Sequence, residues 1–136
     1  MNTALSTELY WLIMTIFMTA LLWIPYILNR MQEQGIASAI WDRFGYTSTN
    51  RDWARRMMQA HENATENLVL FAPLVILVQL SGVQSKITAM ACMVYFFARL
   101  THYVVFTFAI PVLRVVSFLT GFAMQMILLT ELLKRL

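Results

Sequence analysis

Charged side chains are scarce in this chain. Of its 136 residues, 12% are charged and 60% are hydrophobic, whereas soluble proteins average roughly 25% and 45–50%. A soluble domain of this length buries only a modest fraction of its surface, so it could not hide so much apolar area from water. Intrinsic disorder is excluded as well, because disordered segments combine low hydrophobicity with high net charge. The composition therefore predicts an integral membrane protein, whose outer surface faces lipid.

Residues that carry much of enzyme chemistry are equally few. The single cysteine, Cys92, allows no internal disulfide and no cysteine-based zinc site, and the chain has only two histidines. The stretch from His61 begins like a zinc-protease helix but has Thr65 in place of the second histidine. The sequence contains no phosphate-binding glycine loop and no serine-nucleophile motif. We therefore predict no metal site.

Acidic residues are outnumbered by basic ones, which gives a net charge of +3 and a pI near 9.4. Basic proteins can bind nucleic acid, but lysine and arginine are also enriched in the cytoplasmic loops of membrane proteins. Because most of this chain is apolar, lysine and arginine in cytoplasmic loops are enough to explain the positive net charge, and no nucleic-acid partner is required. We predict contacts with membrane lipids and none with nucleic acid.

Long uncharged stretches predict four membrane-spanning helices. Residues 9–28 carry no charge and could cross about 30 Å of hydrocarbon. The third stretch is interrupted by Arg99, and Pro111 separates it from the last. The segment between the first two helices, with Gly35, Gly45 and residues 46–50, is predicted to be irregular. We predict a single all-α domain, a four-transmembrane-helix bundle with helices at about 5–29, 51–81, 86–110 and 114–134.

The positive charges predict the orientation of this bundle. Six arginines lie in the segment before the second uncharged stretch or in the last connection, against three basic residues on the opposite side. Because positive charge concentrates on the cytoplasmic side, we predict a cytoplasmic first loop and both termini on the non-cytoplasmic side. The six are Arg30, Arg43, Arg51, Arg55, Arg56 and Arg114, and the three are Lys86, Lys134 and Arg135.

Polar residues within or bordering the spans form two one-sided sets. Ionisable groups in such positions are costly and indicate function by default. At 100° per residue, the set on the second helix shares an arc of about 80°, and the set on the third helix an arc of about 60°. The first set is Arg56, Gln59, Asn63 and Glu66, and the second is Tyr95, Arg99, His102 and Phe106.

A short turn near residues 82–85 brings these two faces together. Folding about this turn puts Glu66 level with Thr101, close to Arg99 and His102. Glu66 and Arg99 could simply pair, because an unpaired charge at this depth would cost several kcal/mol. The surplus of arginines and histidines at the same end also fits a pocket that an anionic ligand completes, since guanidinium groups bind carboxylates bidentately.

At these positions the sequence resembles the MAPEG family, the membrane-associated proteins in eicosanoid and glutathione metabolism. Residues 59–68, Gln-Ala-His-Glu-Asn-Ala-Thr-Glu-Asn-Leu, are similar to the Arg-Ala-His-x-Asn-x-x-Glu-Asn pattern of microsomal glutathione transferases. Residues 95–102, Tyr-Phe-Phe-Ala-Arg-Leu-Thr-His, and 110–114, Ile-Pro-Val-Leu-Arg, carry the rest of the likeness. Residues 23–30, Trp-Ile-Pro-Tyr-Ile-Leu-Asn-Arg, resemble the compact bacterial branch, which implies a multi-pass protein of the bacterial inner membrane.

The resemblance implies a homotrimer that binds glutathione between neighbouring subunits near the cytoplasmic face. It also implies a glutathione-dependent transferase or peroxidase for hydrophobic electrophiles, with Arg114 as the catalytic residue. A guanidinium group favours the nucleophilic thiolate form of glutathione, because an ordinary thiol has a pKa of about 8.5. The expected glutathione-binding residues are Arg30, Arg56, Gln59, His61, Asn63, Glu66, Arg99, His102 and Tyr103.

Two positions depart from the family pattern. Gln59 stands where members commonly have arginine, and Phe106 stands where glutathione-active members have a tyrosine, with Tyr103 one turn away. These departures motivate an alternative, a non-catalytic trimer of the same family that binds lipids or small molecules. A third hypothesis is a small transporter or channel subunit with Arg99 and Glu66 along a polar path, but the sequence has no internal repeat to support it.

Overall fold

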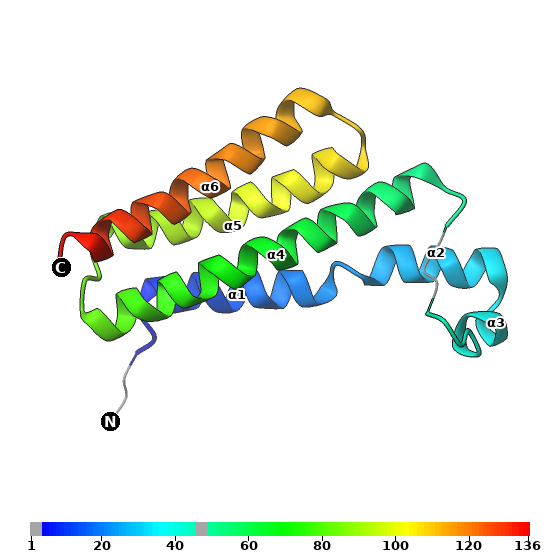
Figure 1. The fold of residues 1–136 in the computed structure, drawn as a ribbon, viewed down its shortest axis with the longest axis horizontal. Helices are drawn as coiled ribbons and strands as arrows, with labels where there is room; N and C mark the ends of the chain where they lie inside the picture. Colours follow the sequence, from blue (N-terminus) through cyan, green and yellow to red (C-terminus); the bar gives the residue numbers. More distant parts are fainter. Residues whose placement is uncertain (1–3, 46–48) are drawn as a thin grey trace.

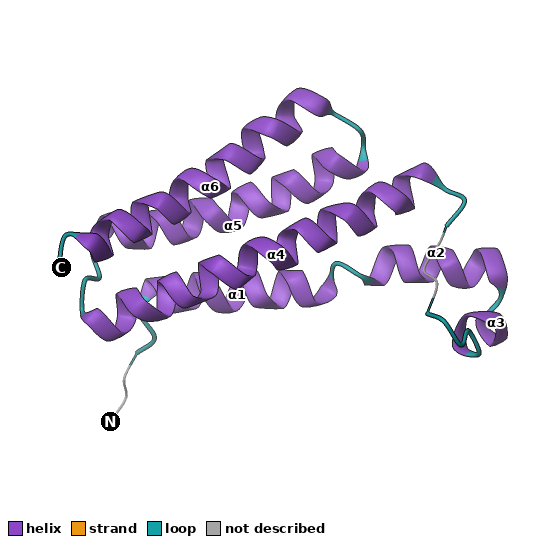
Figure 2. Cartoon of the chain, in the orientation of Figure 1, coloured by secondary structure: helices purple, strands orange, loops and turns teal. Residues whose placement is uncertain are grey.

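The computed structural model describes residues 4–45 and 49–136. These residues form helices joined by short segments and contain no strand, which confirms the all-α prediction (Figures 1 and 2). The helices are α1 (Thr7–Leu21), α2 (Ile24–Gln34), α3 (Ile36–Ile40), α4 (Asp52–Ser81), α5 (Lys86–Thr107) and α6 (Pro111–Leu133).

Within the described residues, four helical segments are long and apolar enough to cross a membrane. They contain between 22 and 30 residues, which corresponds to about 33–45 Å at 1.5 Å per residue. Large apolar side chains such as Phe17, Leu80 and Val112 are exposed on their outer faces, where lipid is the favourable solvent. The chain is therefore an integral, multi-pass membrane protein. The spans are Thr7–Gln34, Asp52–Ser81, Lys86–Thr107 and Pro111–Leu133.

The helix α5 packs against α1, α4 and α6 and is the most buried of the four membrane spans. The α4–α5 turn shares one end of the bundle with the start of α1 and the end of α6, whereas α3 and the α5–α6 turn lie at the opposite end (Figure 1). Phe71 of α4 stacks on Tyr95 of α5 with ring centroids 3.7 Å apart. This stacking fixes the register of the two helices in the apolar core.

The first membrane span is broken, whereas the sequence predicted one continuous helix over 5–29. Two residues separate α1 from α2, and the span then continues to Gln34. Pro25 explains the break, because proline lacks the N–H of a helical hydrogen bond and its ring clashes with the preceding turn. The carbonyl of Leu22 at the break accepts a hydrogen bond of 2.8 Å from the hydroxyl of Tyr103. The break thus provides an anchor for α5.

Two other boundaries differ from the sequence prediction. The last helix begins at Pro111 rather than at residue 114, because a proline in the first turn removes an N–H that would have no helical partner anyway. The segment before α4 was predicted to be irregular, yet it contains the short helix α3. Of that predicted irregular stretch, residues 46–48 lie outside the described part of the chain.

A buried carboxylate joins α1 to α5 near the α4–α5 turn. Glu8 is only 3% exposed, and its Oε1 accepts a hydrogen bond of 2.5 Å from the hydroxyl of Thr88. Thr88 also belongs to the capping box of α5, in which it and Ser85 each accept a hydrogen bond from the other's backbone N–H. Because a carboxylate is stabilised by the dipole at a helix N-terminus, this contact holds α1 on α5.

We predict that replacing Glu8→Ala lowers the free energy of unfolding by about 2 kcal/mol, because it removes a charged acceptor from the Thr88 hydroxyl. Glu8→Gln keeps an acceptor oxygen and should retain most of the stability. Thr88→Val should cost more, because it also removes the acceptor of the Ser85 N–H in the capping box, and the double variant of Glu8→Ala and Thr88→Val should cost little more than Thr88→Val alone. Unfolding in detergent, followed by circular dichroism, measures all four variants, and additive losses would contradict this explanation.

Candidate functional site

The guanidinium group of Arg99 lies inside the bundle between α4 and α6. The residue is 1% exposed. Its Nη1 donates to Oδ1 of Asn63 at 3.1 Å, and its Nη2 donates to the backbone carbonyl of Phe118 at 3.0 Å. The ring centroids of Tyr95 and Phe118 lie 5.5 and 5.2 Å from its Cζ atom, so aromatic faces complete the cradle.

This guanidinium has no carboxylate partner among the described residues. The ion pairs there are Arg30–Asp42, Arg55–Asp52 and Lys134–Glu131. The suggested pairing with Glu66 is not formed, because Glu66 is exposed and lies about 60° further around α4 than Asn63. The Nε of Arg99 has no hydrogen-bond partner either. A buried positive charge is thus held by neutral acceptors alone.

Gly121 provides the space that Arg99 occupies on α6. A Cβ atom at this position would lie 2.7 Å from Nε and 2.9 Å from Cζ of Arg99, closer than real Cβ contacts permit. The guanidinium therefore lies directly on the backbone of α6, where it reaches the Phe118 carbonyl. The glycine at this position is required by the close approach of a charged side chain.

One turn further along α5, His102 connects the same face to the start of α6. Its Nδ1 lies 3.1 Å from the carbonyl oxygen of Arg114 and 3.3 Å from the hydroxyl oxygen of Ser117. The Nε2 of this buried ring has no partner. The side chain of Arg114 is exposed and its Cζ lies 4.9 Å from the ring centroid of Phe106. His102 thereby holds the helix turn that carries Arg114.

Arg56 joins this group from α4. Its Nε donates to the carbonyl of Thr107 at 2.9 Å, at the C-terminal end of α5, where a positive charge is favoured by the helix dipole. It therefore reaches the residue next to Phe106, the ring on which Arg114 packs. We call Arg56, Arg99, His102 and Arg114 the basic cluster.

Other predicted site residues lie on a different face, along α2 and α4. The hydroxyl of Tyr26 lies 2.8 Å from Nδ1 of His61. Next to this pair, Glu62 and Glu66 are exposed one helical turn apart. They border a groove of about 440 Å³, which we call the acidic groove. Its lining residues are Tyr26, His61, Glu62, Thr65, Glu66 and Val69.

Apart from Asn63, which contacts Arg99, three predicted binding residues belong to neither group within this chain. Arg30 is buried and forms an ion pair with Asp42. Gln59 is exposed on α4. The hydroxyl of Tyr103 donates to the backbone carbonyl of Leu22 at 2.8 Å, at the break between α1 and α2.

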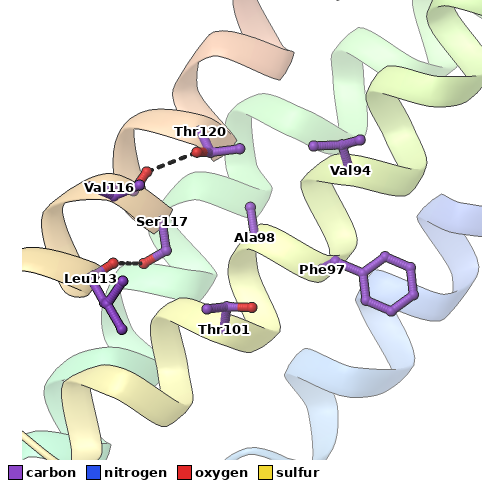
Figure 3. A pocket seen from close by; sticks show the side chains of 8 residues that line it. All are labelled: Val94, Phe97, Ala98, Thr101, Leu113, Val116, Ser117 and Thr120. Carbon is purple, nitrogen blue, oxygen red and sulfur yellow. Dashed lines mark hydrogen bonds between the residues drawn. The ribbon is translucent and has the colours of Figure 1, made fainter. Parts of the chain in front are cut away.

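An apolar groove of about 310 Å³ runs between α5 and α6 (Figure 3). The hydroxyls of Ser117 and Thr120 donate back to carbonyls of their own helix, at 2.7 and 2.8 Å. With these groups satisfied, the groove presents a largely apolar surface. Its lining residues are Val94, Phe97, Ala98, Thr101, Leu113, Val116, Ser117 and Thr120. Ser117, whose hydroxyl oxygen lies 3.3 Å from Nδ1 of His102, places the groove beside His102.

Sequence reasoning missed the residues of α6 and α2 that complete these sites. Phe118 and Ser117 contribute a backbone carbonyl and a hydroxyl, which no residue pattern marks as special. Tyr26, which contacts His61, lies on α2 just beyond the break in the first span. Gly121 was the one available signal, since an isolated glycine within an apolar helix points to a close approach.

Comparison with known proteins gives one family match. The MAPEG family model matches residues 9–134 of the chain. No curated protein and no solved structure matches it.

We predict that Gly121→Ala displaces the Arg99 guanidinium and lowers the free energy of unfolding by about 1–3 kcal/mol, as overpacking does in tight interiors. In an Arg99→Ala background the same substitution meets no obstacle, and alanine should raise stability by about 0.5–1 kcal/mol through its helix propensity. Chemical unfolding of the four proteins in detergent tests this reversal of sign. A Gly121→Ala loss that is equal in both backgrounds would contradict the contact.

Proposed function

Because the chain belongs to the MAPEG family, we propose that it is a glutathione-dependent membrane transferase acting on hydrophobic electrophiles, with a related peroxidase activity. The family is one of glutathione and eicosanoid metabolism, and the membrane-spanning helices of this chain agree with a lipid-embedded reaction site. The proposed chemistry is attack of the glutathione thiolate on an electrophilic carbon, which forms a thioether and releases the leaving group.

The observation that carries this proposal is the unpaired guanidinium of Arg99. A buried charge in a low-dielectric interior is costly unless it is paired, and the hydrogen bonds of Arg99 go only to the Asn63 amide and the Phe118 carbonyl, both of which are neutral. An anionic ligand would supply the missing charge, and carboxylates are good partners for a guanidinium. Glutathione carries two carboxylates and a thiol, and it is the ligand that family membership favours.

We assign Arg114 the catalytic role of stabilising the thiolate. Its side chain is exposed and packs on Phe106, one helical turn from His102. A guanidinium beside the sulfur lowers the thiol pKa, which raises the fraction of nucleophile at neutral pH. The apolar groove between α5 and α6 lies beside His102, and in the proposal a hydrophobic electrophile reaches the sulfur from the lipid along it. This route suits substrates that partition into membranes.

The remaining family-matched residues support a site shared between subunits of a homotrimer. In one chain, the basic cluster and the acidic groove lie on separate faces, and only Asn63 of the predicted α4 residues contacts Arg99. In the proposal, Glu66 and His61 of one subunit bind the glutathione amine and backbone, together with Gln59. The basic cluster and Asn63 of its neighbour bind the carboxylates and thiolate. Two incomplete half-sites thus form one complete site.

We further propose that the end of the bundle with α3 and the α5–α6 turn faces the cytoplasm. Arg43, Arg55, Arg56 and Arg114 lie in or next to the elements that end there. Positive charge marks the cytoplasmic side of membrane proteins. Both termini then lie on the non-cytoplasmic side, and the proposed site opens toward the cytoplasm of a bacterial inner membrane, where glutathione is available.

The alternative is a non-catalytic trimer that binds lipids or small molecules. The observation that favours it is the lack of a hydroxyl beside Arg114, because position 106 is phenylalanine and the Tyr103 hydroxyl is bound to Leu22. The apolar groove would then hold a lipid rather than an electrophile. Glutathione binding separates the two functions, since only the enzyme requires it.

We predict that the purified protein binds glutathione in calorimetry and conjugates it to an activated aryl halide. Arg114→Ala should lower kcat/KM by about 10²–10³-fold with little change in glutathione affinity, because it removes stabilisation of developing charge. Arg99→Ala should abolish binding. Arg135→Ala, which removes an exposed charge at the other end of the bundle, is the matched control. Absence of glutathione binding by the wild type would refute the enzyme and favour the alternative.

We predict that two inactive variants complement each other, because each site draws on two subunits. Arg114→Ala and Glu66→Ala chains carrying different affinity tags are co-expressed, and mixed trimers are isolated by sequential purification. In every mixed trimer one of the three interfaces joins an intact Arg114 to an intact Glu66, so about one third of wild-type activity should return. Mixed trimers as inactive as the parent variants would show that each site lies within one subunit.

A further inference from the structure

The segment between α2 and α4 presents an exposed apolar surface. Ile36 and Ile40 are 64% and 68% exposed, and Trp41 and Phe44 are 83% and 77% exposed. The first two lie one turn apart on α3, and the two aromatic residues follow within four positions. We call these four side chains the apolar tip. So many large apolar groups together are unusual on a surface that meets water.

The apolar tip is held in place by polar contacts behind it. Gly35, with φ of 82°, ends α2 and turns the chain into α3. The buried Arg30 of α2 then forms an ion pair with Asp42, which lies between Trp41 and Arg43 in the sequence. Because this pair is anchored on a membrane-spanning helix, the apolar side chains are presented in a fixed direction.

A second set of contacts fixes the far end of the same segment. The buried hydroxyl of Thr49 donates to Oε1 of Glu33 at 3.0 Å and accepts from the side chain of Asn29 at 2.8 Å. The N–H of Asn50 donates to the other oxygen of Glu33 at 3.1 Å. Polar contacts therefore hold the chain to α2 on both sides of the apolar tip, and the folded structure keeps its four side chains exposed.

The position of α3 indicates what covers the apolar tip. Only Gly35 separates α3 from Gln34, the last residue of the first membrane span. The short helix packs against α2 at the end of the bundle, and in Figure 1 it lies on the opposite side of α2 from α4. A segment attached so closely to a spanning helix lies at the level of the lipid headgroups, and it faces outward from the bundle.

We propose that the apolar tip inserts into the headgroup–acyl boundary of the bilayer and anchors this segment on the membrane surface. Tryptophan and phenylalanine favour that layer, and apolar side chains on short amphipathic helices enter it in the same way. The positive charge of the exposed Arg43, two residues after Trp41, is complementary to the lipid phosphate groups at this depth. The bilayer is also the apolar medium nearest to α3, because only Gly35 separates this helix from the first membrane span. This inference does not depend on the proposed enzyme activity.

The test is the depth of Trp41 in vesicles. A protein with Trp11→Phe, Trp23→Phe and Trp53→Phe keeps Trp41 as its single tryptophan and is reconstituted with phosphatidylcholines brominated at different acyl positions. We expect quenching about twofold stronger from bromine near the headgroup end than from bromine near the chain end. A reference protein with Phe17→Trp in a background without other tryptophans should show the opposite order, because position 17 lies near the middle of the apolar run 9–28.

A second measurement avoids the triple substitution. Cys92 is fully buried, so a cysteine introduced by Ile40→Cys can be spin-labelled selectively in an otherwise natural chain. The label should collide with oxygen, which dissolves in lipid, more often than with a water-soluble nickel chelate. The proposal would be overturned if no brominated lipid quenched the Trp41 fluorescence and the spin label at position 40 collided with the nickel chelate more often than with oxygen. The apolar tip would then be a surface for a protein partner.

Discussion

The guanidinium of Arg99 lies in the interior of a lipid-embedded bundle and is held only by an amide oxygen, a backbone carbonyl and two aromatic rings. A permanent charge in such surroundings constrains everything packed around it. It requires Gly121 on α6 and a polar residue at position 63 of α4. Arg99 is carried by α5, the most buried of the four membrane spans. The missing counter-charge is the basis of the proposed anionic ligand.

The other polar groups divide according to what they do for the fold. Glu8 and Thr88 join α1 to α5 at one end, and Arg30 and Asp42 hold the loop segment at the other. The basic cluster and the acidic groove are different, because neither is neutralised within the described chain. Their separation on two faces is costly for a lone subunit in lipid, and assembly around an anionic ligand offers a physical reason for it.

Much of the architecture follows from the sequence because lipid imposes simple rules. Span length, scarcity of charge and the polar motif residues sufficed to predict four membrane-crossing helices and to recognise the family. The errors arose where one residue altered local geometry. Pro25 breaks the first span, and Pro111 starts the last helix three residues before the predicted start at residue 114. Asn63, rather than Glu66, meets Arg99, because a rotation of 60° on a helix decides which side chain faces inward.

The sequence by itself determined the solvent of this protein, its helical class, its family and the small set of polar residues that need an explanation. These properties depend on composition and on neighbours along the chain, which the sequence displays directly. Only the tertiary structure decided how the polar residues are grouped, since contacts such as Arg99–Phe118, Tyr103–Leu22 and Arg56–Thr107 use backbone carbonyls that every residue has. The sequence does not indicate which backbone carbonyls accept these hydrogen bonds, because that depends on how the helices pack.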